Sequence, residues 1–252
     1  MIGLVVDSNS QIPGELARRY DVEVVPLTVT VDGVPYAEGE DLDADGFWAA
    51  FEGASPIVTT SQPSPGRFAQ AYAAVAARGA EEILSVHIGS ALSGTVSSAR
   101  VAAASAPVPV RIVDTGTASF AVTCCLWEAA EAVRAGASLE EAAGVAETVA
   151  PTIDTVFVVG ALDLARAGGR LATSAEEPAS EVPLLSLAGG AMEVVGRVAD
   201  LDQAADAMAA WVRAAGPSLR VGVGTANPGT AALGQALADH LAGAAEVAEL
   251  VR

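Results

Sequence analysis

The chain has 252 residues and a formal net charge of −18, from 31 acidic and 13 basic side chains. Such an acidic surface repels phosphate backbones and anionic membranes, so we expect no nucleic-acid partner. Every basic residue is an arginine, and the absence of lysine excludes a Walker A lysine, a pyridoxal Schiff base and a lysine phosphate clamp.

The sequence predicts a protein without a membrane span, a signal peptide or a cofactor. Charged or small polar residues interrupt each apolar stretch before it reaches the length of a bilayer. Met1–Val6 has no basic n-region, so we expect no signal peptide and a cytoplasmic protein. The adjacent Cys124 and Cys125 suit a reducing compartment as small core residues. His87 and His240 are not at a metal-ligand spacing, so we expect neither a metal site nor a cofactor.

The first part of the chain alternates short β-branched runs with segments of helical periodicity. We expect strands at Ile2–Val6, Val22–Val31, Glu82–Ile88 and Val108–Val113, and helices at Pro13–Tyr20, Phe47–Phe51, Arg67–Ala77, Ser97–Ala104, Ser119–Ala135 and Ser138–Val149. Alternation of this kind predicts a parallel sheet with helices on both faces.

The pattern changes near Pro151. The later part is expected to form strands at Thr155–Val159, Pro183–Leu187, Met192–Val198 and Leu219–Gly224, with helices at Asp202–Ala214 and Thr230–Ala242. Strand pairs followed by a helix indicate an α+β unit. The predicted fold class is therefore α/β, with a parallel-sheet α/β domain over 1–152 and a smaller α+β domain over 153–252.

Two hydroxyl-rich segments precede helices. The first contains Thr60 and Ser61 and ends at Ser64, which can cap the next helix with Pro65 in its first turn. The second is Gly89–Thr95, after the strand that contains His87. We expect both at the carboxyl ends of parallel strands, where ligands usually bind. Hydroxyls and backbone N–H groups at a helix start suit a carboxylate or phosphate, although either segment could be an ordinary cap.

Enzyme motifs fit the chain poorly. No nucleophile elbow surrounds Ser61 or Ser93, and His87 should lie inside the preceding strand, away from Ser93. The segment Gly222–Asn227 lacks the third glycine of a dinucleotide fingerprint. The sequence therefore favours a binding protein over an enzyme.

Short motifs along most of the chain resemble the DegV family, the fatty-acid-binding subunits of bacterial fatty acid kinase. The matching motifs, in chain order, are Val6-Asp7-Ser8, Val25-Pro26-Leu27 with Gly33 and Tyr36, Thr60-Ser61-Gln62-Pro63-Ser64, Leu92-Ser93-Gly94-Thr95, Val113-Asp114-Thr115 and Gly168-Gly169-Arg170. The motif Thr60-Ser61-Gln62-Pro63 followed at this separation by Leu92-Ser93-Gly94-Thr95 is quite specific to the family.

The resemblance implies one long-chain fatty acid, buried in a tunnel between the two domains. Its carboxyl group would be held by Thr60, Ser61 and Ser93, with Gly94 and Thr95 through their backbone; Ser119 is a further expected ligand-binding residue. Arg170 would lie near the head group or face a partner, or form a salt bridge between the domains. The family implies an ATP-dependent kinase subunit as partner, which phosphorylates the bound carboxylate, so the chain itself would catalyse nothing.

Three departures from the family pattern bear on these expectations. Ala121 and Thr123 stand where the family usually has glycines, and would narrow or redirect the acyl tunnel. Segment 172–182 is short and acidic. The sequence ends at Arg252, where the family continues into a final strand and a motif with His and Gly near the head group.

Two alternatives stay open from the residues. The same hydroxyl loops would suit a sensor or enzyme for another small anionic metabolite. A degenerate member kept for protein interaction would hold no tight ligand.

Overall fold

The computed structural model describes residues 1–50, 56–159, 181–188, 191–225 and 228–251. The chain divides into two compact units. The first comprises Met1–Asp43 and Pro56–Ile153, and the second Ala44–Ser55 and Asp154–Arg252. The expected domain boundary between residues 152 and 153 stays a prediction.

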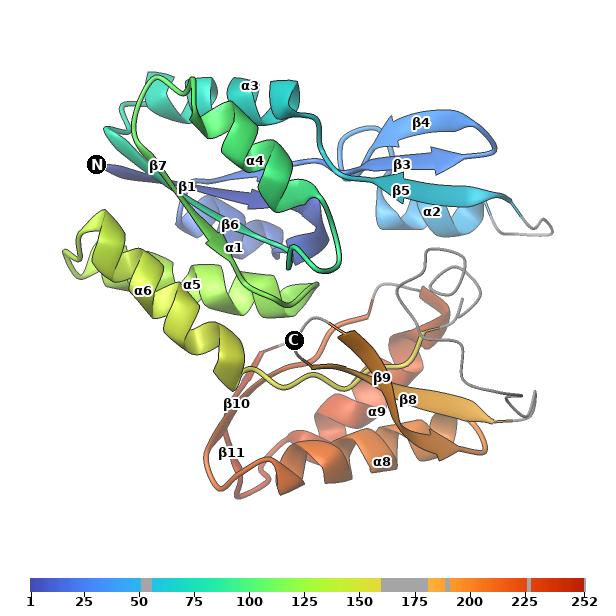
Figure 1. Ribbon diagram of the computed structural model, residues 1–252. Helices are drawn as coiled ribbons and strands as arrows, with labels where there is room; N and C mark the ends of the chain where they lie inside the picture. Colours follow the sequence, from blue (N-terminus) through green and yellow to red (C-terminus); the bar gives the residue numbers. More distant parts are fainter. Residues whose placement is uncertain (51–55, 160–180, 189–190, 226–227, 252) are drawn as a thin grey trace. The chain divides into compact units, whose positions relative to one another are not determined.

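A four-stranded parallel sheet forms the centre of the first unit (Figure 1). Its order is β2-β1-β6-β7, with the strands β1 (Ile2–Asp7), β2 (Val22–Val25), β6 (Glu82–His87) and β7 (Val110–Asp114). Every neighbouring pair is parallel, and Leu4 lies opposite both Val22 and Leu84. The predicted parallel sheet is confirmed.

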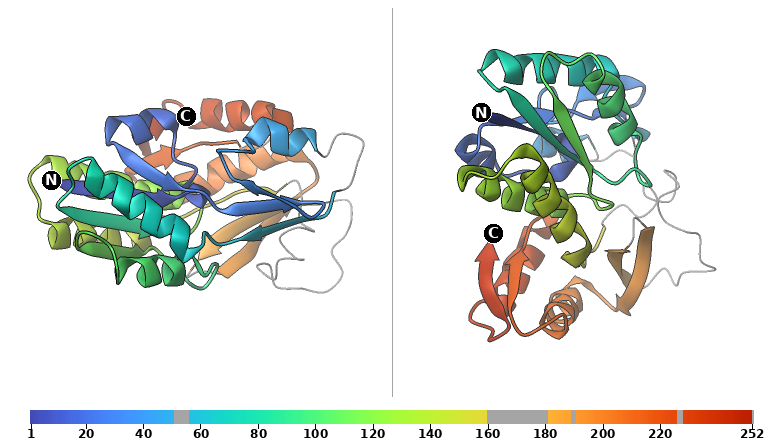
Figure 2. Two further views of the ribbon diagram at one scale, coloured as in Figure 1. Left: turned by 90° about the horizontal axis from the view of Figure 1, so that it is seen from above. Right: turned by 60° about the vertical axis from the view of Figure 1, so that its left-hand side comes forward.

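Helices cover both faces of this sheet (Figures 1 and 2). On one face Leu4, Val6 and Leu84 pack against α5 (Phe120–Arg134) and α6 (Leu139–Val149). On the other, Val5 and Ile83 pack against α3 (Pro65–Ala77) and α4 (Thr95–Ala103). Successive strand residues point to opposite faces, so the near-continuous apolar runs of β1 and β6 serve both cores.

Polar caps begin two of these helices. The Ser64 hydroxyl accepts the Arg67 N–H at 3.2 Å with Pro65 in the first turn, which confirms the predicted cap. Ser138 and Glu141 form a reciprocal capping box at α6. The first unit also contains the short helix α1 (Gly14–Arg19) and the 3₁₀ turns η1 (Ser8–Ser10) and η2 (Ala150–Thr152). The short helix α2 (Ala44–Ala49) belongs to the second unit.

A separate antiparallel sheet in the first unit has the order β4-β3-β5. It contains β3 (Thr28–Val31), β4 (Val34–Ala37) and β5 (Val58–Ser61). The predicted single strand Val22–Val31 was wrong, because the chain leaves the parallel sheet after Val25. Pro26 follows there, and proline has no backbone N–H for a strand ladder.

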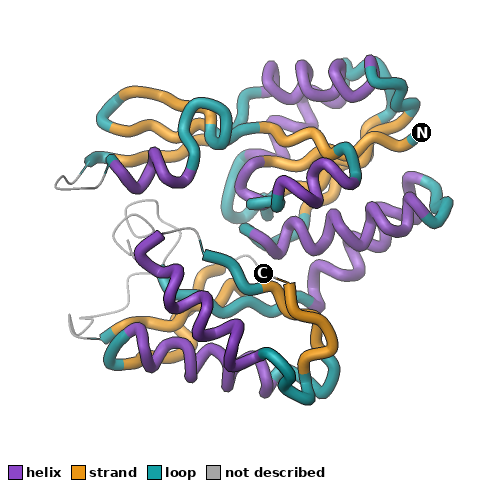
Figure 3. The backbone as a smooth tube through the Cα atoms, turned by 180° about the vertical axis from the view of Figure 1, so that it is seen from behind, coloured by secondary structure: helices purple, strands orange, loops and turns teal. Residues whose placement is uncertain are grey.

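The second unit is built on two strand pairs (Figure 3). β8 (Val182–Ala188) and β9 (Ala191–Val198) are antiparallel, and β10 (Leu219–Gly222) runs parallel to β11 (Val247–Val251). The helices α8 (Leu201–Ala214) and α9 (Ala231–Leu241) lie side by side, and the turn η3 (Pro228–Thr230) precedes α9. Leu184, Met208 and Leu241 are buried in one core. Of the expected strand Thr155–Val159, only Phe157 makes a bridge, to Leu185.

The helices that the structure describes are all too short or too polar to cross a membrane.

Candidate functional site

The carboxyl ends of the parallel strands bring three polar side chains to one edge of the sheet. β1 ends at Asp7, β6 at His87 and β7 at Asp114. The chain continues from β1 to β2 on one side, and β6 lies on the other side of β1. The strand order therefore reverses between β1 and β6, and ligands of such sheets bind outside the strand ends at this point.

The loop Gly89–Gly94, which we call the Ser93 loop, joins β6 to α4 at this edge. The Leu92 and Ser93 N–H groups donate to the Gly89 carbonyl, which makes the loop a tight turn. Ser93 is half-buried, and its Oγ lies 2.8 Å from the Thr95 Oγ1 and accepts the Thr95 N–H at 3.3 Å. Thr95 is fully buried, so its hydroxyl serves to orient Ser93.

Thr60 and Ser61 reach the site by a different route from the expected one. They lie exposed on β5, opposite Val29 and Thr28 of β3 in the antiparallel sheet. The expectation that they end a strand of the parallel sheet was wrong. The structure still places the segment after them against the Ser93 loop, because a methyl group added to Gly94 would come within 2.9 Å of the Gln62 Nε2. Gln62 therefore covers Gly94, and the two hydroxyl segments lie next to one another.

Ser119 stands at the start of α5 in a backbone conformation that is rare for serine, with φ 60° and ψ −148°. Its N–H donates to the Asn9 Oδ1 at 2.9 Å and its hydroxyl donates to the Gln11 Oε1 at 3.0 Å. These bonds tie Ser119 to the segment that follows β1. Arg170 lies outside the described residues.

Ala121 and Thr123, the two departures from glycine, are both buried near the start of α5. The Thr123 hydroxyl donates to the Ser10 carbonyl at 2.9 Å. Thr123 therefore joins α5 to η1, while its expected effect on an acyl chain remains a prediction.

A buried row of polar side chains lies beside the Ser93 loop, and sequence reasoning missed it. The Tyr72 hydroxyl lies 3.0 Å from the Ser85 Oγ, which lies 2.6 Å from the His87 Nε2. The His87 Nδ1 lies 3.0 Å from the Asp7 Oδ2, which also accepts the Ile88 N–H at 3.0 Å. The signal was the period-two spacing of Ser85 and His87, which puts both side chains on one face of β6.

Two further carboxylates lie around this edge. Burial by itself raises the pKa of Asp114, but hydrogen bonds from Ser90 and Gly116 outweigh it and bring the pKa below its usual value. Burial raises the pKa of Glu38; the hydrogen bond from Ser8 opposes this rise, and the charge of Asp7 adds to it. The Ser8 hydroxyl also accepts the Leu27 N–H at 2.9 Å, so it links the end of β1 to the antiparallel sheet.

Among the described residues, no group of three or more His, Cys, Asp or Glu side chains could hold a metal ion.

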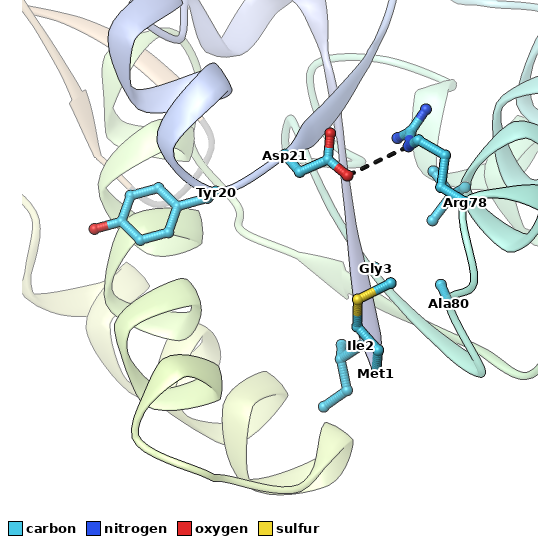
Figure 4. A pocket seen from close by; sticks show the side chains of 8 residues that line it. Met1, Ile2, Gly3, Tyr20, Asp21, Arg78 and Ala80 are labelled. Carbon is cyan, nitrogen blue, oxygen red and sulfur yellow. Dashed lines mark ion pairs between the residues drawn. The ribbon is translucent and has the colours of Figure 1, made fainter.

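A small hollow lies elsewhere in the first unit, at the amino end of β1 (Figure 4). Asp21 and Arg78 form an ion pair of 3.4 Å at its rim. The residues that line it are Met1, Ile2, Gly3, Tyr20, Asp21, Val75, Arg78 and Ala80. It lies at the end of the sheet opposite to the hydroxyl loops and shares no residue with them.

Comparisons with known proteins agree with this arrangement. The model of the DegV family, described as uncharacterised protein, matches residues 1–250. A DegV domain-containing protein of Streptomyces coelicolor is 38% identical over 200 residues, which cover 78% of this chain and 71% of that protein. One of Deinococcus radiodurans is 38% identical over 215 residues, covering 84% of this chain and 76% of that protein.

Solved structures share the fold. A DegV family protein from Thermus thermophilus, whose structure is described as fatty acid binding, is 35% identical with a TM-score of 0.82, over 99% of this chain and 91% of that one. DegV from Bacillus subtilis, described as a fatty acid binding protein, has a TM-score of 0.84 at 24% identity, over 99% and 90%. At that identity the second match shows the fold alone.

A doubly wound α/β unit with a hydroxyl loop after its strand β6, in one chain with an α+β unit, defines the class of protein. Within that class, the chain belongs to the DegV family.

Proposed function

We propose that this chain binds a long-chain fatty acid and holds its carboxylate with Thr60, Ser61 and Ser93, assisted by Gly94, Thr95 and Ser119. The observation that supports the proposal is the close approach of Gln62 to Gly94, which brings the segment after Thr60 and Ser61 against the Ser93 loop. Support comes from the Thermus thermophilus relative, which is 35% identical over 99% of this chain and is described as fatty acid binding. For Arg170 the proposal keeps two positions, near the head group or facing a partner.

The chemistry of this edge suits a carboxylate. Ser93 Oγ already accepts the Thr95 N–H, so its own hydrogen can point to a ligand oxygen when Thr95 Oγ1 acts as the donor. A hydrogen bond from a neutral hydroxyl to a charged oxygen contributes about 1.5–3 kcal/mol. Most of the favourable binding free energy, before entropic and polar costs, comes from the acyl chain, because burial of each methylene contributes about 0.8 kcal/mol.

We propose further that the chain is a carrier that presents the carboxylate to an ATP-dependent fatty acid kinase. A neutral set of hydroxyl donors fixes the head group and leaves a carboxylate oxygen able to attack a phosphoryl group. A bidentate arginine clamp would occupy both oxygens. The reacting groups and the ATP site would belong to the partner, so the proposal gives this chain no catalytic residue.

The first test identifies what the purified protein holds. We expect denaturing extraction and mass spectrometry to recover close to one fatty acid per chain, and this would also give its length. Recovery of a phosphorylated or other small anionic metabolite instead would replace the fatty acid as the proposed ligand. A protein that is isolated empty and does not bind added oleate or palmitate contradicts the proposal.

The second test removes one hydroxyl. We expect Ser93→Ala to weaken oleate binding about tenfold or more, because a donor to the charged head group is lost. The matched control is Ser97→Ala, an exposed serine on α4, the helix that follows the Ser93 loop, and it should bind as the wild type does. Isothermal titration or fluorescence displacement measures both variants. Equal affinity of all three proteins would remove Ser93 from the site.

The carrier role needs a separate assay. With ATP and a bacterial fatty acid kinase, acyl phosphate should form on fatty acid supplied by this chain, and Ser93→Ala should lower the rate. Tight fatty acid binding without any acyl phosphate would leave the binding proposal standing and reject the carrier role.

A further inference from the structure

Strand alternation collects a buried polar row on one face of the parallel sheet. Ser85 and His87 are two residues apart on β6, and Asp7 ends the neighbouring β1. Tyr72 approaches the same face from α3. All four side chains are 0% exposed, so each of their polar hydrogens needs an acceptor within the protein.

A count of hydrogen-bond donors and acceptors decides which partner donates in each hydrogen bond of the row. Burial raises the pKa of Tyr72 to about 12, so its hydroxyl keeps its hydrogen and donates to Ser85. Ser85 then donates to Nε2 of His87, and Nδ1–H of His87 donates to Asp7. With the opposite direction, the Tyr72 hydrogen would have no acceptor among the described residues. In the direction from Tyr72 to Asp7, Nε2 of His87 is the acceptor, and Nδ1 carries the hydrogen that is donated to Asp7.

The row ends where the Ser93 loop begins. Asp7 Oδ2 accepts both the His87 ring N–H and the backbone N–H of Ile88, the residue before the loop. From the other side, Thr115 N–H and hydroxyl donate to the His87 carbonyl at 3.2 and 2.8 Å. The Asp7 carboxylate is thus the only described side chain that joins β1 to the peptide at the start of the loop.

We propose that Asp7 and His87 are positioning residues for carboxylate recognition. Asp7 fixes the peptide at Ile88, His87 fixes the Asp7 carboxylate, and the two together set the direction in which the Ser93 hydroxyl points. This inference rests on the proposed function, but it predicts properties of the unliganded protein as well.

Three variants test the row. Asp7→Ala removes the acceptor of the Ile88 N–H, and Asp7→Asn keeps a carbonyl oxygen that can accept both hydrogen bonds. Tyr72→Phe is the control, because it removes a buried hydrogen bond at the far end and leaves the contacts of Asp7 intact. For each variant we would measure three properties: backbone amide exchange of the Ser93 loop without ligand, affinity for oleate, and thermal stability.

We expect Asp7→Ala to speed amide exchange at Ile88 and through the Ser93 loop and to weaken oleate binding about tenfold or more. Asp7→Asn should recover most of both properties. Tyr72→Phe should lower the melting temperature while loop exchange and oleate affinity stay close to wild type. The proposal would be overturned if Tyr72→Phe and Asp7→Ala lose the same amount of stability and also lose the same amount of oleate affinity.

The ring of His87 gives a readout that needs no stable Asp7→Ala protein. Nitrogen-15 shifts of the wild-type imidazole should show a neutral ring protonated at Nδ1, and a ring protonated at Nε2 would overturn the assignment. If the wild type binds no oleate, the proposed function fails, while amide exchange and the ring tautomer still decide whether Asp7 and His87 position the loop.

Discussion

Glu38 is a carboxylate that is partly withdrawn from water next to another acid. Its side chain is half-buried, accepts the Ser8 hydroxyl, and lies close enough to Asp7 for that charge to act on it. Burial is the largest cause of its raised pKa, so the ionised form of Glu38 opposes folding. We infer that the link between β1 and the antiparallel sheet is retained at a cost in stability.

The pH dependence of Glu38→Gln tests this inference. A carboxyl group with a raised pKa binds its proton more tightly in the folded chain than in the unfolded chain, where its pKa is near 4.5. The wild type should therefore lose stability relative to Glu38→Gln as the pH rises through 4.5 and then through the raised value. Urea unfolding across the acidic to neutral range measures the difference.

Glu15→Gln is the control for the loss of one surface charge, because Glu15 is exposed on α1. A free-energy difference between Glu38→Gln and wild type that does not depend on pH would show that burial of Glu38 has no energetic effect.

At the scale of elements, the hairpin β3–β4 depends on one turn. Asp32 and Gly33 connect the strands with φ values of 48° and 84°. A two-residue turn with both φ values positive is the form that matches the twist of a hairpin, and it favours Asp-Gly. This dipeptide was the signal from which β4 could have been predicted.

Glycine substitutions at two sites should have opposite effects. Gly33→Ala forces a Cβ into the left-handed region and should destabilise the protein by about 1 kcal/mol. Gly144 lies inside α6 with open space around an added Cβ, so Gly144→Ala should stabilise by about 0.5–1 kcal/mol. Denaturant unfolding measures both, and destabilisation by Gly144→Ala or none by Gly33→Ala would contradict this account.

A second contact between elements is that of Gln62, which follows β5, with Gly94 of the Ser93 loop. Gly94→Ala would bring a methyl carbon within 2.9 Å of Nε2 and 3.1 Å of Cδ of Gln62. The end of a flexible side chain can move away, so we expect weaker oleate binding with little change in stability. Adding Gln62→Ala should restore part of the affinity, with a coupling free energy of about 1 kcal/mol between the two substitutions. Additive losses in this double-mutant cycle would show that the contact does not align the loops.

At the scale of the whole molecule, charge and core have separate consequences. A net charge of −18 acts against association with nucleic acid whatever the fold. The cores depend on many small side chains, such as Ala142, Ala143 and Ala146 of α6, which are fully buried against the sheet. Small side chains let α6 pack closely on the sheet, so enlarging any of them would strain the packing.

The sequence by itself located the parallel strands and the helices on the two faces of that sheet, because hydrophobic period and caps are local properties. It did not separate β3 from β2 and did not predict β4 or β5. Ser64 was correctly predicted as a cap, and His87 was correctly placed inside its strand. The family could also be inferred, since its motifs are continuous along the chain. Apart from Ser119, the residues proposed for the carboxylate lie in those motifs.

Only the tertiary structure decided what these residues touch. Pro26 ends the first run of strand, and the return of β5 to β3 moves Thr60 and Ser61 out of the parallel sheet. The buried row connects Tyr72 to Asp7, which are 65 residues apart in the sequence, through Ser85 and His87. These contacts exist because β1 pairs with β6 and α3 packs on the sheet. Strand order and helix packing are set by non-local contacts, and a local pattern of residues does not contain them.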